Sequence, residues 1–134
     1  MSRFDEKGYF VMENAPVYLT LDMDRTAKWF EDVLGWYSNI VERDGSRNGT
    51  YGVVFDMLPE VERTHLAPFT GMQMFYGQPE PRWISFMQVR GIEKMYGYIT
   101  ANGWDKITEV KVQPWGGKTC DLTTVDGYVI KIFE

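Results

Sequence analysis

Hydrophobic and polar positions change their period along the first half of the chain. Residues 16–22 alternate between the two kinds, which predicts a strand with Val17, Leu19 and Leu21 on one face. Apolar residues then recur at spacings of three and four up to Leu34, which predicts a helix. Further strands are expected at 36–42, 50–57 and 71–76, around a polar turn at 43–50 and an irregular loop at 58–70.

The same order of elements returns in the second half. A strand is expected at 84–89, a helix from Ile92 that ends at Gly103, and strands at 106–112, 117–124 and 127–133. The dipeptide Gly103-Trp104 repeats Gly35-Trp36 at the end of the first helix. We therefore predict an α+β fold: a single domain over 1–134, built from two βαβββ modules at about 14–78 and 82–134. Two such modules would form a curved mixed sheet with an open cleft.

Composition narrows the classes of protein that fit this pattern. The chain has 134 residues, 44% hydrophobic and 25% charged, which suits a globular domain able to fold without disulfides. Its net charge of -5 is opposite in sign to that expected of a nucleic-acid-binding domain. No apolar run is long enough to span a membrane, and the first residues do not read as a secretory signal. We expect a cytoplasmic protein with neither nucleic-acid nor membrane partners.

The single cysteine and the single histidine limit the possible chemistry. Cys120 lies in a strand-like stretch with no histidine near it in sequence, and we interpret it as a packed thiol. His65 stands near Glu60 and Glu62 in the loop at 58–70, at a spacing that matches no metal motif, so we expect a solvated loop. Aromatic residues are the unusual class at 16%, and some are expected to line a surface or pocket.

Asp22, Phe30 and Leu34-Gly35 share their spacing with a known family, and so does the closing stretch Val-Asp-Gly-Tyr-Val-Ile at 125–130. The chain resembles the vicinal oxygen chelate superfamily, which includes glyoxalase I, extradiol dioxygenases and bleomycin-resistance proteins. Segments 89–96 and 113–116, and the opening Pro16-Val17, are most similar to the bleomycin-resistance proteins. The resemblance covers about residues 14–134 and implies the glyoxalase/bleomycin-resistance fold.

The resemblance also implies where a metal would bind. The superfamily's enzymes hold a divalent cation with His, Gln and Glu on four inner strands, at positions that here are Ala15, about Phe75, Ile84 and Lys131. Alanine, phenylalanine and isoleucine side chains cannot coordinate a cation, and lysine would first have to lose its proton. A slip of one strand would bring in Gln73 or Glu134 but not three ligands. We therefore expect no metal, no cofactor and no metal-dependent catalysis.

Bleomycin-resistance proteins lack the metal and sequester the drug between the subunits of a dimer. The resemblance therefore implies a homodimer whose N-terminal strand crosses to the partner at Pro16, where proline fixes φ and donates no hydrogen bond. An ordinary proline at the start of a strand is the alternative. We expect this cleft to bind an aromatic small molecule, an antibiotic. A divergent glyoxalase- or dioxygenase-type metalloenzyme and a ligand-sensing module of a regulator stay open as alternatives.

Trp115 is the first candidate ligand-binding residue. It lies in the turn Gln-Pro-Trp-Gly-Gly, where Gly116 and Gly117 leave the indole uncovered and free to stack on a planar ligand. The matching tryptophan of the family stacks on the flat rings of the drug. The alternative is an indole folded back on the rim of the sheet.

The second-half strand at 84–89 supplies further candidates. We expect Ile84, Phe86 and Gln88 to face the cleft, with Phe86 as a stacking wall or as plain core and Gln88 as a hydrogen-bonding group. Trp83 either binds as well or only covers the start of the strand. Lys131 either contacts an anionic or carbonyl group of the ligand, which argues against bleomycin itself, or extends into solvent. The candidates in the first half are Gln73, Phe75, Asn39 and Tyr51.

Overall fold

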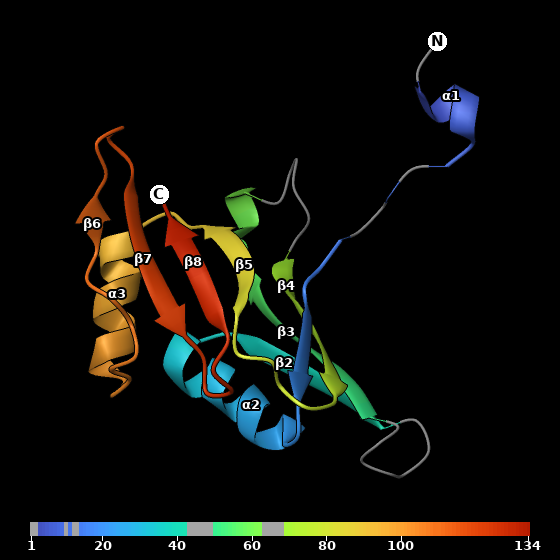
Figure 1. The fold of residues 1–134 in the computed structure, drawn as a ribbon, viewed down its shortest axis with the longest axis horizontal. Coiled ribbons are helices and arrows are strands. Elements are labelled where there is room, and N and C mark those ends of the chain that lie inside the picture. The colour runs from blue at the N-terminus through green and yellow to red at the C-terminus, as the bar shows by residue number, and fades with distance from the viewer. Residues whose placement is uncertain (1–2, 10, 12–13, 43–49, 63–68) are drawn as a thin grey trace.

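The computed structural model describes residues 3–9, 11, 14–42, 50–62 and 69–134. Their strands form two four-stranded sheets, one from each half of the chain, with the orders β1-β4-β3-β2 and β5-β8-β7-β6 (Figure 1). The first sheet contains β1 (Val17–Thr20), β2 (Tyr37–Glu42), β3 (Thr50–Met57) and β4 (Phe69–Tyr76). The second contains β5 (Trp83–Gln88), β6 (Lys111–Val112), β7 (Lys118–Thr123) and β8 (Val129–Phe133).

The two sheets are built alike. β1 pairs in parallel with β4, and β5 pairs in parallel with β8, while the other neighbouring strands are antiparallel. After its first strand each half forms a helix: α2 (Met23–Trp29), continued by the wider turn η1 (Phe30–Leu34), and α3 (Ile92–Ala101). The predicted α+β class and the repeat of two βαβββ modules are therefore confirmed.

The helix boundaries follow the signals in the sequence. The carboxylate of Asp22 caps α2 by accepting the backbone N–H of Arg25 at 3.1 Å. Gly35 and Gly103 both adopt positive φ, at 71° and 88°, a conformation that favours glycine. The backbone N–H of the tryptophan after each glycine then donates back to a carbonyl of the preceding helix. The repeated Gly-Trp dipeptide is therefore a helix stop, as predicted.

The start of α3 is capped from a distant part of the chain. The Glu134 carboxylate accepts the backbone N–H groups of Gly91 at 2.9 Å and Ile92 at 3.0 Å. These two hydrogen bonds favour the charged form and hold the pKa of Glu134 below its usual value. The residue after β8 thus fixes the helix of its own module.

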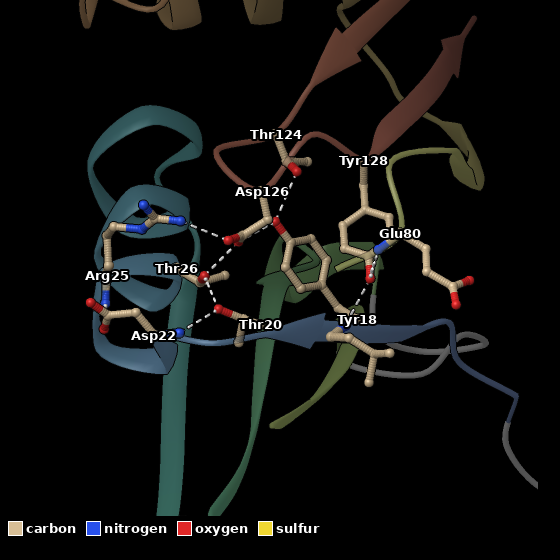
Figure 2. Close-up of polar contacts among 10 residues, drawn as sticks. Tyr18, Thr20, Asp22, Arg25, Thr26, Glu80, Thr124, Asp126 and Tyr128 are labelled. Atoms are coloured by element: carbon tan, nitrogen blue, oxygen red, sulfur yellow. Dashed lines mark hydrogen bonds and ion pairs between the residues drawn. The ribbon is translucent and has the colours of Figure 1, made fainter. Parts of the chain in front are cut away.

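A buried polar cluster joins the two modules (Figure 2). The Tyr18 hydroxyl on β1 donates to Asp126 at 2.8 Å and lies 2.8 Å from the Thr124 hydroxyl. Asp126 also accepts from Thr26 at 2.6 Å and from Arg25 at 2.7 Å, and its side chain is only 2% exposed. Burial raises the pKa of Tyr18 far above its ordinary value, so its hydroxyl remains a donor at neutral pH. The turn before β8 is thereby fixed to β1 and α2, and the buried apolar side chains of both halves form one core.

Three elements differ from the sequence prediction. β6 is much shorter than the predicted strand at 106–112, because the Thr108 hydroxyl accepts the Asp121 N–H at 2.8 Å where a ladder carbonyl would stand. The predicted loop at 58–70 includes the short helix η3 (Glu60–Glu62), and β4 begins within it. A short helix α1 (Arg3–Lys7), which the periodicity did not predict, lies apart from both sheets in Figure 1. No described helix is long and apolar enough to cross a membrane.

Candidate functional site

The outward side of the second sheet carries a group of exposed aromatic side chains. Strand pairing sets Phe86 opposite Lys131 and Gln88 opposite Phe133, while Ile132 on the other side of β8 is buried in the core. Trp83 and Phe86 are 62% and 69% exposed. We call this group the second-sheet face and define it as Trp83, Phe86, Gln88, Asp121, Lys131 and Phe133.

The prediction that Ile84 shares a face with Phe86 is wrong. Trp83 pairs with Val129 and Ser85 pairs with Ile130, so β5 carries one extra residue at this point. Ile84 is that extra residue, and its side chain packs against the core. The bulge therefore puts Trp83, rather than Ile84, on the same side of β5 as Phe86 and Gln88.

Two of these aromatic residues stack on one another. The ring centroids of Phe86 and Phe133 are 4.2 Å apart and the ring planes are within 13° of parallel. Most of Phe86 remains open to solvent in this arrangement. An exposed, flat and apolar surface of this kind suits contact with a planar molecule.

Lys131 lies between the aromatic side chains and an acid. Its ammonium is 3.2 Å from a carboxylate oxygen of Asp121 on β7 and 5.2 Å from the ring centre of Trp83 on β5. The side chains of Lys131 and Asp121 are 25% and 31% exposed. The lysine is therefore held on the sheet by an ion pair and a cation–π contact rather than extended into solvent.

Trp115 lies at the tip of the turn between β6 and β7 and is 68% exposed. The indole is largely uncovered, although one part of its ring lies directly against Gly117. A Cβ added at Gly117 would overlap the six-membered ring. One side of the indole is thus supported by backbone, and the high exposure leaves much of the rest accessible.

The candidates from the first half lie on the outward side of the first sheet. Phe75 stacks on Tyr51 with ring centroids 6.4 Å apart, and strand pairing sets Gln73 next to Val53, which in turn pairs with Asn39. A second pair on this sheet, Tyr37 and Phe55, stacks at 5.7 Å and was not among the predicted residues. The alternation of β2 and β3 would have identified both, because they share a face with Asn39 and Tyr51.

The four positions at which the resemblance implies a metal do not form a metal site here. Phe75 is stacked on Tyr51, Ile84 packs into the core, and Lys131 is paired with Asp121. Ala15 lies just before β1 and has no side-chain donor. Within the described ranges, no three His, Cys, Asp or Glu residues gather closely enough to hold a metal ion. These residues do not fit a divalent metal ion.

A separate groove of about 950 Å³ opens where the two modules meet. Its lining includes Trp36, Met57, Met87, Gln88, Met95 and Tyr98. Sequence reasoning did not predict this groove, because its wall comes from the loop after β3, the end of β5 and the side of α3. It is distinct from the exposed aromatic side chains of the second-sheet face.

The remaining sequence candidates have different outcomes. Cys120 is buried at 4% exposure, and burial raises its pKa to about 11, so its interpretation as a packed thiol is confirmed. His65 lies outside the described residues. Pro16 is half-buried directly before β1, and its carbonyl accepts the N–H of Gln73 at 3.0 Å.

Comparison with known proteins finds a solved structure of high sequence identity to this chain. A solved glyoxalase-related enzyme from Clostridium phytofermentans is 46% identical, with a TM-score of 0.81 over 96% of this chain and 98% of that one. A sequence profile described as the bleomycin resistance protein domain matches residues 15–77. No curated protein matches the chain significantly.

Two further solved structures are similar at lower identity. A bleomycin-binding protein complexed with bleomycin is 21% identical, with a TM-score of 0.63 over 92% of this chain and 98% of that one. A member of the glyoxalase/bleomycin resistance protein/dioxygenase superfamily from Sphaerobacter thermophilus DSM 20745 is 15% identical, with a TM-score of 0.71 over 93% and 98%. At these identities the likeness shows a shared fold.

Proposed function

Since this chain belongs to the glyoxalase/bleomycin resistance/dioxygenase superfamily, we propose that it binds and sequesters a bulky, flat aromatic molecule without a bound metal. The ligand is an antibiotic, and binding protects the cell by lowering the free concentration of the drug. No proton transfer or nucleophile is required for this role. The protein would act in the cytoplasm, where a buried free cysteine agrees with a reducing compartment.

The observation that carries the proposal is the exposed aromatic surface of the second sheet. Trp83 and Phe86 contribute little to the core, because both are more than half exposed. Exposed aromatic side chains on one sheet face favour association, either with a ligand or with a partner. Gln88 on the same side of β5 adds a hydrogen-bonding group that would orient a ligand.

The proposal includes a homodimer in which the outward sheet faces of two copies enclose the ligand. The stacked pair of Tyr51 and Phe75 on the first sheet offers a second aromatic wall. β1 is an edge strand of that sheet, and α1 before it lies apart from the body of the chain (Figure 1). If the N-terminal segment crossed to a second copy at Pro16, that copy would provide a surface on which the segment could pack.

Tryptophan fluorescence of metal-stripped protein tests the proposal directly. The protein is titrated with bleomycin, anthraquinones and planar peptide antibiotics, with Trp115→Ala measured in parallel. We expect saturable quenching by at least one compound, at one ligand per subunit, with weaker binding in the variant. Absence of quenching by every compound, together with a stoichiometric metal in untreated protein, would contradict sequestration.

A second candidate function rests on the 46% identity to the glyoxalase-related enzyme. In that case the chain catalyses a reaction on the same fold. An activity that is lost on chelation and restored by a divalent cation would favour the enzyme. Retention of ligand binding after chelation would favour sequestration.

A further inference from the structure

Lys131 places a positive charge, paired with Asp121, among the aromatic side chains of the second-sheet face. Lys131 is on β8, an interior strand of its sheet. Its neighbours on the two adjacent strands are Phe86 on β5 and Asp121 on β7. Phe133, two residues further along β8, stacks on Phe86. A planar molecule that covers this pair of rings would therefore bring its edge close to the ammonium.

The contacts of Lys131 leave room for another acceptor. An ammonium group has three N–H donors. The Asp121 carboxylate, 3.2 Å away, is an ion-pair partner that lacks hydrogen-bond geometry, and the Trp83 ring, 5.2 Å away, provides a contact through its face. The lysine side chain is still 25% exposed, so a donor can reach a group that approaches from the open side.

The positive charge of the Lys131 ammonium favours some planar ligands over others. A charged acceptor forms a stronger hydrogen bond with an ammonium than a neutral one does, and a ligand that excludes water increases the difference. A cationic substituent at the same place would be repelled by Lys131. A neutral amide would make the contact with less energy than a carboxylate.

We infer that the ligand carries an acidic oxygen, a carboxylate or a phenolate, which binds the Lys131 ammonium while its rings stack on the second-sheet face. The inference rests on the proposed function and narrows it to a chemical class. Lys131 then acts as a fixed positive charge, and Asp121 is both its anchor and its competitor for the ligand's anion.

A pair of ligands that differ only in charge tests the inference. Anthraquinone-2-carboxylate and anthraquinone-2-carboxamide have the same ring system, and their affinities are measured by tryptophan quenching at pH 7. We expect the wild type to bind the carboxylate about tenfold more tightly than the carboxamide. Lys131→Met, which keeps a long unbranched side chain, is expected to abolish that preference, because it weakens carboxylate binding much more than carboxamide binding. Lys131→Arg is expected to retain it.

Asp121→Asn separates ligand recognition from a structural role. A structural ion pair predicts that loss of either partner weakens the binding of both ligands alike. Our inference predicts that the two substitutions change the preference for the carboxylate in opposite directions. Lys131→Met abolishes the preference, whereas Asp121→Asn removes the competing anion and increases it. The double variant Lys131→Met/Asp121→Asn, which leaves neither charge of the ion pair without its partner, replaces Lys131→Met if that variant does not fold.

Equal affinity of the wild type for the two ligands would overturn the inference and leave the proposed function standing. So would an equal loss of both ligands in Lys131→Met with the fold intact. No binding of either ligand would count against the proposed function itself, and the inference would fall with it.

Discussion

The rings of Phe86 and Phe133 stack 4.2 Å apart, within 13° of parallel, on the side of the second sheet that does not pack into the core. The opposite side of β8 carries Ile130 and Ile132, both fully buried. The core of the second module is therefore complete without the phenylalanine pair. Ligand binding by the phenylalanine pair and stability of the core can therefore be tested independently by mutation.

Phe86→Ala is expected to weaken ligand binding at least about tenfold, because it removes half of the stacking surface. The free energy of unfolding should change by about 1 kcal/mol or less, since Phe86 is 69% exposed. Urea denaturation and the quenching titration give the two quantities. Tyr98→Ala, which removes a half-exposed ring from α3, is the matched control and should leave ligand affinity unchanged. A similar loss of affinity in both variants would contradict the assignment.

Gly117→Ala should displace the indole of Trp115. The new methyl group would occupy space that the ring now fills, so the ring must move away from the turn. We expect weaker ligand binding and a shifted emission spectrum with little loss of stability. Gly97→Ala on α3 is the control, because a Cβ there meets nothing within 4 Å. That variant should be more stable by about 0.5–1 kcal/mol and bind normally. Unchanged emission and affinity in Gly117→Ala would show that the indole is not held against the glycine.

Tyr18→Phe should destabilise the fold by about 1–3 kcal/mol, because it takes a donor from the buried Asp126 carboxylate. The ring itself is retained, so the loss reports the hydroxyl. Thermal or urea unfolding measures the change. Thr100→Val, at an exposed hydroxyl that bonds only within α3, is a control expected to have a much smaller effect. Equal stability of Tyr18→Phe and the wild type would contradict the linking role of the cluster.

The cap on α3 should make stability depend on pH. The pKa of Glu134 is lowered in the folded protein by the N–H groups of Gly91 and Ile92. Its stabilising contribution is therefore fully present above the unfolded pKa and is lost as pH falls through the lower folded pKa. We expect the wild type to be more stable than Glu134→Gln at pH 7, with the difference disappearing in acid. Urea unfolding of both proteins between pH 7 and pH 3 tests this, and a difference that persists undiminished at pH 3 would contradict it.

The repeat of elements could be predicted because its signals are local. The stop at Gly35, the stop at Gly103 and the cap at Asp22 each depend on residues close in sequence. The cap on α3 could not be predicted in this way. Glu134 reaches Gly91 only because β8 and β5 are neighbours in the sheet.

The sequence predicted which residues face outward on β8 and on most of β5, but it did not predict the register of β5 at its start. Phe86, Gln88 and Lys131 lie on one side of the sheet, as alternation indicated. Ile84 and Trp83 exchanged places because of a bulge, which alternation does not reveal. The partnership of Lys131 with Asp121 also required the strand pairing, since neither residue is close to the other along the chain.

Indole N–H resonances of ¹⁵N-labelled protein provide the most direct test of where the ligand binds. The five tryptophans report on different places: Trp83 and Trp115 are exposed, Trp29 and Trp104 pack on each other, and Trp36 lines the groove between the modules. On titration with the tightest-binding planar compound, we predict shifts of Trp83 and Trp115, with Trp29 and Trp104 unchanged. Shifts confined to Trp36 would place the ligand in the groove and contradict a binding site on the second-sheet face.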